Sequence, residues 1–341
     1  MPYINDRLAA EHDAAEQRDY KRSTARQSRF LFQPEKVMQL LRKRIVGQDG
    51  VLAAIDDMLH VVKADIGNKQ RPLSVMMFLG PTGVGKTETA RLVAEGILGS
   101  SDALCRIDMN TLAQEHYSAA LTGAPPGYVG SKEGQSLLNN DAIAGSFSLP
   151  SVVLFDEIEK ASDEVIRALL NVLDTGKLLM ASGVKEIDFR NSLIFMSSNV
   201  GASDVDAFRS QRHHFWGRGK QERRIVERAL HKKFDPEFIN RIDAILSFRH
   251  LQREHLFSVL DLELAKLQLR LEKRQVALQL DLNCRNYLVE KYDARYGARH
   301  IARRLRRDLE PAAARAMLAK PDEREFIAFI QNERIVVEAL Q

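Results

Sequence analysis

The chain has 341 residues, about twice the ~150 residues of a typical domain, so its length favours two domains. Hydrophobic residues make up 45% and charged residues 28%, a globular composition that excludes a wholly disordered chain and a low-complexity scaffold. The formal net charge of +4 is too small for this length to indicate a nucleic-acid partner.

Cys105 and Cys284 are too few for a zinc ribbon or a disulfide framework, which fits a reducing compartment. No run approaches the roughly 18 apolar residues needed to cross a bilayer, and the N-terminus has no apolar signal core. We therefore expect a cytoplasmic protein with no membrane partner.

Residues 1–33 are polar and mixed in charge, which is typical of a solvated arm; a partner-binding segment is the alternative. A helix is expected from Pro34, because proline suits a first turn and apolar residues follow at helical spacing. Beyond it, strand-length apolar runs alternate with stretches long enough for crossover helices; the runs cover residues 73–79, 104–107, 151–155 and 193–196. This alternation predicts an α/β domain over 34–249, with a parallel sheet flanked by helices.

A second, smaller domain is predicted over residues 250–341. Leucines recur at spacings of four, four, three and four from Leu256 to Leu271, which indicates one long amphipathic helix. Short apolar runs at 276–280, 326–330 and 335–337 suggest a small sheet. The domain is therefore expected to be α+β.

The strongest motif follows the first apolar run and precedes a helical stretch; it reads Gly80-Pro81-Thr82-Gly83-Val84-Gly85-Lys86-Thr87. This matches the phosphate-binding loop pattern G-x-x-x-x-G-K-[ST]. The glycines let successive backbone N–H groups face the phosphates of ATP, and the helix N-terminus adds its dipole. Lys86 is expected to neutralise β/γ oxygens, and Thr87 to offer its hydroxyl to Mg²⁺.

Asp156 and Glu157 end the apolar run at 151–155. Adjacent carboxylates at the carboxyl edge of a parallel sheet lie where ligands of such folds bind. Asp156 is placed to hold Mg²⁺, and Glu157 to orient and polarise the attacking water. The alternative, that both only cap the next helix, is outweighed by the upstream loop. Together the two elements predict Mg-ATP hydrolysis.

From about residue 40 to the C-terminus the chain resembles the second AAA+ module of Clp-family unfoldases of the ClpB/ClpA type. Besides the two elements above, the resemblance is carried by Val46-Gly47-Gln48, Arg106-Ile107-Asp108-Met109, Gly123-Ala124-Pro125-Pro126-Gly127-Tyr128-Val129-Gly130, Asp188-Phe189-Arg190-Asn191, Ser198-Asn199, Phe238-Ile239-Asn240-Arg241 and Tyr296-Gly297-Ala298-Arg299. It implies an AAA+ P-loop NTPase fold whose smaller domain acts as a lid.

The resemblance also implies further site residues. Asn199 corresponds to sensor 1, which helps to hold the lytic water, and Arg299 to sensor 2, which reaches the γ-phosphate of its own subunit. Arg241 corresponds to the arginine finger delivered to the ATP of a neighbouring subunit. Val46 is expected to pack on adenine. Taken alone, Asn199 would suit a turn before Gly201, Arg241 an ion pair with Asp243, and Val46 an ordinary core position.

Gly127-Tyr128-Val129-Gly130 has flexible glycines on both sides of an aromatic and an aliphatic residue, which presents Tyr128 rather than burying it. In Clp unfoldases this loop lines the axial pore and grips an extended polypeptide. A tyrosine covering a small local core is the alternative.

The interval before Arg241 reads, from Phe208 to Gly217, FRSQRHHFWG. ClpP-partnered relatives carry an Ile-Gly-Leu/Phe tripeptide here; it is absent, so a ClpP-type protease partner is not predicted. Trp216 in this basic and aromatic interval suggests an adaptor site or a local hydrophobic plug. The segment from Leu137 to Pro150 also departs from the family pattern.

We therefore expect an ATP-driven unfoldase or remodelling chaperone that acts on polypeptide as a homohexameric ring. One alternative is a nucleotide-controlled assembly factor that binds one partner without threading it. The other is a nucleic-acid motor or loader, in which the basic arm and residues 212–216 contact DNA or RNA.

Overall fold

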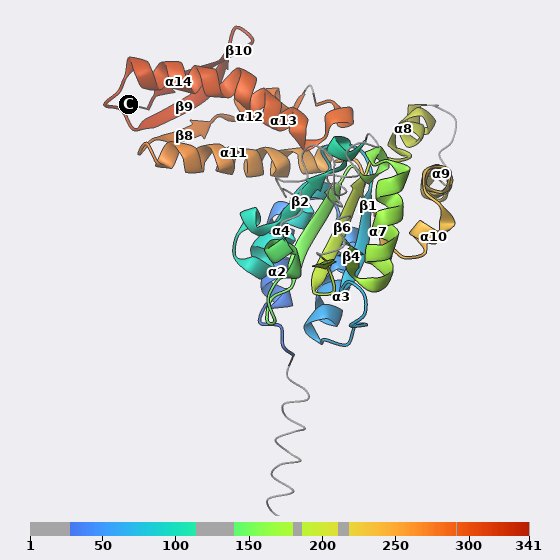
Figure 1. The fold of residues 1–341 in the computed structure, drawn as a ribbon. Coiled ribbons are helices and arrows are strands. Elements are labelled where there is room, and N and C mark those ends of the chain that lie inside the picture. The colour runs from blue at the N-terminus through green and yellow to red at the C-terminus, as the bar shows by residue number, and fades with distance from the viewer. Residues whose placement is uncertain (1–27, 114–139, 180–185, 211–217, 291, 341) are drawn as a thin grey trace, which may run out of the picture.

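The computed structural model describes residues 28–113, 140–179, 186–210, 218–290 and 292–340. They form a larger unit around a central sheet and a smaller unit, coloured orange to red, above it (Figure 1). Within these ranges, no helix combines the length and the apolar character needed to cross a membrane.

Five parallel strands form the central sheet, in the order β2-β3-β6-β1-β7. They are β1 (Ser74–Leu79), β2 (Cys105–Asp108), β3 (Ser151–Asp156), β6 (Ser192–Ser198) and β7 (Ala244–Ser247). The four strands predicted from sequence are confirmed. The edge strand β7 is missing from that prediction because its apolar run, Ala244 to Leu246, is only three residues long, and its residues alternate between half-buried and exposed.

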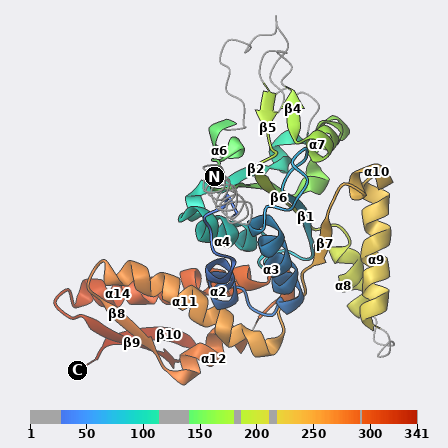
Figure 2. The ribbon, with the colours of Figure 1, turned by 90° about the horizontal axis from the view of Figure 1, so that it is seen from below.

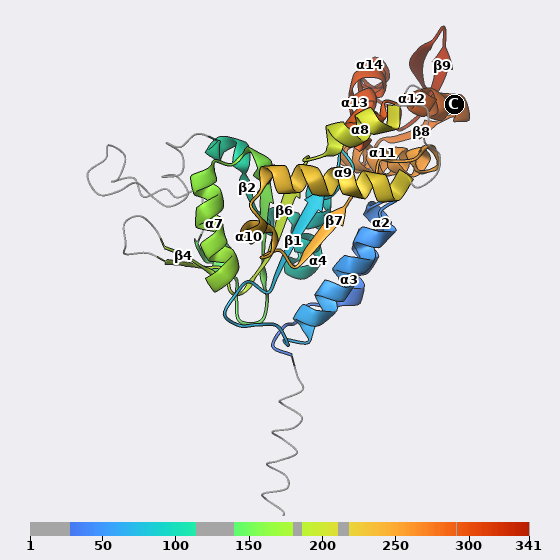
Figure 3. The same cartoon turned by 90° about the vertical axis from the view of Figure 1, so that its right-hand side faces the viewer.

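Helices cover both faces of this sheet, as predicted. One face carries α2 (Pro34–Arg44), α3 (Asp49–Lys63) and α4 (Lys86–Leu98). The other carries α6 (Asn140–Ala144), α7 (Asp163–Thr175), α9 (Arg218–Lys233) and α10 (Pro236–Ile239). Figure 3 shows α7 on one side of the strands and α2 and α3 on the other.

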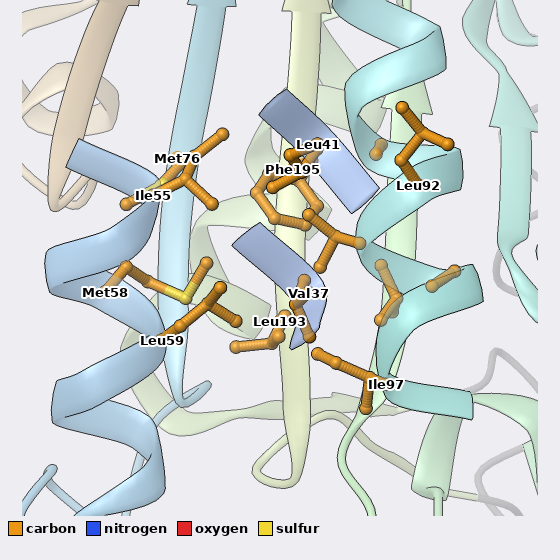
Figure 4. Close-up of a cluster of buried hydrophobic side chains, with 14 of the residues drawn as sticks. Val37, Leu41, Ile55, Met58, Leu59, Met76, Leu92, Ile97, Leu193 and Phe195 are labelled. Carbon is orange, nitrogen blue, oxygen red and sulfur yellow. The ribbon is translucent and has the colours of Figure 1, made fainter. Parts of the chain in front are cut away.

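Alternate residues of each strand enter the two hydrophobic clusters on either side of the sheet, because successive side chains of a strand point to opposite faces. Figure 4 shows the cluster beneath α2, α3 and α4, where Val37 and Leu41 meet Ile55, Leu59 and Phe195. All five side chains are buried. This packing holds the sheet in place, and the site described below lies at the carboxyl ends of its strands.

The end of the predicted arm belongs to this core. Phe30 and Phe32 are buried in the cluster beneath α2, and the Leu31 N–H donates to the Ser148 carbonyl at 3.0 Å. The sequence analysis assigned these residues to the polar arm, because the apolar run from Phe30 to Phe32 is only three residues long and follows a polar, charged segment. Residues 1–27 of the arm lie outside the described ranges.

Two further pieces extend the larger unit. The strands β4 (Lys177–Leu179) and β5 (Glu186–Asp188) pair antiparallel and project from one end (Figure 2). The helix α8 (Ala202–Ser210) packs on α9 at the β7 edge of the sheet (Figure 2).

The smaller unit has the predicted α+β composition. Its helices are α11 (Leu256–Glu272), α12 (Leu282–Glu290), α13 (Ala298–Arg304) and α14 (Glu310–Ala319), with a π-helical turn over Leu305–Leu309 between the last two. Its sheet has the order β10-β9-β8 and consists of β8 (Ala277–Leu280), β9 (Glu325–Gln331) and β10 (Arg334–Ala339). Its buried cluster contains residues from Leu251 onward. The boundary between the two domains, predicted between residues 249 and 250, stays a prediction.

We expect Phe195→Ala to lower the free energy of unfolding by ~3–5 kcal/mol, because the fully packed ring leaves a cavity in the core. Denaturant unfolding followed by circular dichroism measures this. Phe147→Ala is the matched control: its ring is 77% exposed, so its loss should stay within about 0.5 kcal/mol. Equal losses for the two variants would contradict the packing described here.

Candidate functional site

The loop from Gly80 to Gly85 joins β1 to the N-terminus of α4. Gly83 and Gly85 have φ of 78° and 108°, a left-handed region that glycine enters without steric cost. The helix begins directly at Lys86, so its unpaired N–H groups and the positive end of its dipole face the loop. This is the predicted geometry for holding phosphate.

Lys86 is buried with its ammonium turned back onto the loop. Its Nζ donates to the carbonyl of Gly80, to the carbonyl of Pro81 at 2.8 Å and to Oδ1 of Asn199 at 2.8 Å. Burial lowers the pKa of Lys86 to about 8, and the carboxylate of Glu159 is the strongest influence in the opposite direction. The Lys86 ammonium is therefore a poorly solvated cation, and a bound phosphate could replace the carbonyl oxygens that now accept its hydrogen bonds.

Asp156 ends β3 and is buried among hydrogen-bond donors. Arg106 donates to its Oδ2 from Nε at 2.9 Å and approaches it with Nη2 at 2.6 Å, while the hydroxyl of Ser197 donates to Oδ1. The Thr87 hydroxyl lies 3.3 Å from both carboxylate oxygens. The two predicted magnesium ligands are thus neighbours.

Glu157 leaves the strand in a left-handed conformation, with φ of 58° and ψ of 51°. For a residue with a Cβ this conformation costs roughly 1–2 kcal/mol, so neighbouring contacts must hold it. Its N–H donates to the Ser197 hydroxyl at 3.0 Å, and its Oε2 accepts a hydrogen bond from Asn110 Nδ2 at 2.7 Å. The helix-cap alternative is not borne out for Glu157, whose side chain makes no capping hydrogen bond to the following helical turn.

Asn199 follows β6 at the same edge of the sheet. Its side-chain oxygen accepts from Lys86, and its backbone N–H donates to Oε1 of Glu159 at 3.1 Å. The resemblance implies that Asn199 helps to hold the lytic water; in the structure its side-chain oxygen contacts Lys86, and both Asn199 and Glu157 line the same cavity.

A cavity of about 1040 Å³ lies where the two units meet, and it brings most of the predicted residues together. It is lined by Val46, Thr82, Gly83, Val84, Gly85, Lys86, Thr87, Asp156, Glu157, Asn199 and Arg299. Gly80 and Pro81 are not among the lining residues, but their carbonyls accept hydrogen bonds from Lys86. Its size suits a nucleotide-sized ligand, since such sites span ~300–1,000 Å³.

The smaller unit closes the cavity through direct backbone contact. The Ala298 N–H donates to the Gly83 carbonyl at 2.8 Å. A Cβ on Gly83 would lie 2.2 Å from the Tyr296 carbonyl oxygen, and one on Gly297 would lie 2.4 Å from that of Gly83. Arg299, exposed in the first turn of α13, therefore lines the cavity from the smaller unit, one residue after the contact with the phosphate loop.

A second contact secures the chain between the two units. The buried side chain of Gln48 donates from Nε2 to the Arg249 carbonyl at 2.9 Å and accepts from the Arg249 N–H at 3.0 Å. Next to it, Val46 lines the cavity and also packs against the hydrophobic cluster of the smaller unit.

Arg241 does not line this cavity. It follows α10, and its guanidinium pairs with Asp174 at the end of α7, with Nε and Oδ1 2.7 Å apart. The nearby carboxylate of Asp243, suggested by the sequence as a partner, instead pairs with Arg71 at 3.0 Å. Within one chain, the structure therefore separates Arg241 from the other predicted site residues.

Two sequence predictions fall outside the described residues. The segment Gly127-Tyr128-Val129-Gly130 lies in the range 114–139, and Trp216 lies in 211–217.

Sequence reasoning missed the polar residues that surround the two carboxylates. Arg106 entered only as part of a family motif, and no role was expected for Ser197, Asn110 or Glu159. A usable signal was present: each of them lies in or just after an apolar run that ends at the same sheet edge.

Two known family profiles match the chain in the order of the two units. The AAA domain (Cdc48 subfamily) matches residues 71–245. The C-terminal, D2-small domain of ClpB protein matches residues 251–326.

Similar proteins support the same assignment. The ATP-dependent protease ATP-binding subunit-like protein AmiB of Pseudomonas aeruginosa is 44% identical over 92% of this chain and 88% of its own length. The chaperone protein ClpB of Gloeobacter violaceus is 38% identical over 90% of this chain but only 35% of its own length. A closed-state structure of Hsp104 with ATPγS and FITC casein aligns with a TM-score of 0.76 and 28% identity, over 90% of this chain and 52% of that chain. These matches show that the chain belongs to the Clp family of AAA+ ATPases.

Proposed function

We propose that this protein hydrolyses Mg-ATP to unfold or remodel other proteins in the cytoplasm, threading polypeptide through the pore of a homo-oligomeric, hexameric ring. The observation that carries the proposal is the cavity between the two units. There a buried ammonium, two adjacent carboxylates and an arginine from the smaller unit converge. Hydrolysis in such a cavity is able to change how the two units are arranged.

The residues around Asp156 fit a magnesium ion. The Thr87 hydroxyl and the Asp156 carboxylate offer adjacent oxygens, and Mg²⁺ prefers one or two protein oxygens together with substrate phosphates. Bound with ATP, the ion would neutralise charge on the phosphate oxygens. In this proposal Lys86 binds the β/γ oxygens, Asn199 and Glu157 hold the attacking water, and Glu157 polarises it.

The two arginines link the site to the rest of the assembly. We assign Arg299 to the γ-phosphate of its own subunit, because it reaches the cavity from the smaller unit. Arg241 is assigned to the ATP of the neighbouring subunit, which agrees with its position outside its own cavity. A guanidinium supplied from another subunit makes hydrolysis depend on assembly.

Tyr128 and its flanking glycines are assigned to the pore on the strength of the family motif alone. The Hsp104 structure with casein supports a polypeptide substrate for a related protein. Although AmiB carries the name of a protease subunit, this chain lacks the tripeptide of ClpP-partnered relatives between residues 206 and 220. We therefore propose that it acts without a ClpP-type protease, and that an adaptor supplies selectivity.

ATP affinity should fall as pH rises above about 8, by at most about tenfold per unit. The Lys86 ammonium is charged below its pKa of about 8, and bound phosphate favours the charged form. Above that pH, binding must therefore take up a proton. Calorimetry at pH 9 in buffers of different ionisation enthalpy should show this uptake, which should be absent in Lys86→Gln. An affinity that stays constant from pH 7 to 9.5 would contradict it.

Glu157→Gln should lower ATP turnover by about 100-fold or more while ATP still binds, because the phosphate contacts remain and the polarising carboxylate is gone. Steady-state hydrolysis and nucleotide binding measure the two effects. Glu164→Gln, an exposed carboxylate in α7, is the matched control. The trapped ring should also co-precipitate its substrates. A Glu157→Gln protein that stays monomeric in saturating ATP would rule out the ring.

Tyr128→Ala should abolish unfolding of a fluorescent reporter protein but leave basal ATP hydrolysis, since an aromatic side chain grips a passing chain through contact area. Tyr128→Phe should retain activity. Unchanged unfolding by Tyr128→Ala would instead support an assembly factor that does not thread. ATPase stimulation by DNA rather than by unfolded protein would support the nucleic-acid alternative.

A further inference from the structure

Ser197 stands between the two carboxylates of the site. It lies near the carboxyl end of β6, is 1% exposed, and borders the cavity. The pairing of β3 with β6 ends one step earlier, at Phe155 and Met196. Beyond that pair, the Ser197 side chain provides the cross-strand link.

The Ser197 hydroxyl both donates and accepts a hydrogen bond, and its two partners are the last residue of β3 and the residue after it. Its proton is donated to Oδ1 of Asp156, and its oxygen accepts the Glu157 N–H at 3.0 Å. A serine hydroxyl has one proton to donate, so its direction is fixed by Asp156 and a lone pair is left for Glu157. One side chain therefore ties the carboxylate of Asp156 to the backbone of Glu157.

The hydrogen bond from the Glu157 N–H to Ser197 lies at a strained point of the backbone. Glu157 has φ of 58°, a conformation that residues with a Cβ seldom adopt unless their surroundings hold them there. Of the other hydrogen bonds to Glu157, one reaches its carboxylate from Asn110 and one reaches its carbonyl from the Lys160 N–H at 2.9 Å, whereas the partner of its own N–H is Ser197. Without the Ser197 hydroxyl, the Glu157 N–H would lose its partner, and the strained conformation would lose one of the contacts that hold it.

We propose that Ser197 is a positioning residue for ATP hydrolysis, which holds Glu157 in the left-handed conformation that aims its carboxylate into the cavity. This rests on the proposed role of Glu157 in polarising water. The hydrogen-bond partners of the Ser197 hydroxyl are Asp156 and Glu157, so its one proton is already donated to a carboxylate and is not available to a phosphate. Its removal should therefore affect turnover rather than nucleotide binding.

The test compares Ser197→Ala with Ser197→Thr, which keeps the hydroxyl. We expect Ser197→Ala to lower kcat by about 10- to 100-fold, as removal of an orienting contact commonly does, with the Kd for ATP changed less than about twofold. Ser197→Thr should recover most of the turnover. Ser197→Cys keeps the volume but is a weak hydrogen-bonder, so it should resemble Ser197→Ala even if the smaller variant folds poorly.

Ser192→Ala is the matched control. Ser192 is equally buried in the same strand but lies at its other end, roughly 16 Å away by strand geometry, where it bonds to Ser151 and the Ile143 carbonyl. Its kcat should equal that of the unchanged protein. A similar loss in Ser192→Ala would show that buried serines in β6 act only through stability and would overturn the proposal.

Two further measurements separate the explanations. If Ser197 acted only through Asp156 and its metal, raising Mg²⁺ would restore the kcat of Ser197→Ala; the proposal expects no recovery, and full recovery would overturn it. Glu157→Gln is assayed in parallel. If Glu157→Gln turns over normally, the assigned role of Glu157 fails; if it is inactive while Ser197→Ala is fully active, only the role of Ser197 fails.

Discussion

The buried ammonium of Lys86 is the constraint on which the site depends. A cation with little access to water must be surrounded by oxygen atoms, and here they come from the phosphate loop and from Asn199. Because β1 and β6 are adjacent and parallel, both oxygen sources arrive at the same edge of the sheet. The same adjacency on the other side of β6 brings Asp156 and Glu157 within reach. The strand order is thus what makes the charge tolerable and the site complete.

On the β6 side, the two carboxylates are held by side chains rather than by strand pairing, although Asp156 still pairs with Asp108 of β2. The ladder between β3 and β6 ends at Phe155 and Met196, one residue before the acidic pair. Arg106 then compensates the charge of Asp156, and Asn110 reaches the carboxylate of Glu157. The sheet delivers the residues, and these polar contacts set how they point.

The parts of the fold and site that depend on local sequence could be predicted. The phosphate loop needs its glycines and lysine at fixed spacing, and four strands appear as short runs rich in apolar residues. Contacts between distant segments could not be predicted in this way. Arg241 meets Asp174 rather than the neighbouring Asp243 because α7 lies beside it in space, and Phe30 is buried only because the cluster beneath α2 receives it. Strand β7 was missed for the same reason, since β1 defines it more than its own residues do.

The backbone contact between Gly83 and the turn at Gly297 restricts mutation unusually tightly. Neither position has room for a single methyl group, since the nearest oxygen would be 2.2 Å and 2.4 Å away. The shape of the phosphate loop at Gly83 and the contact of the smaller unit at Gly297 therefore depend on each other. A substitution at either position would act on both properties together, so the protein has no simple evolutionary route to loosen its lid while keeping its phosphate loop intact.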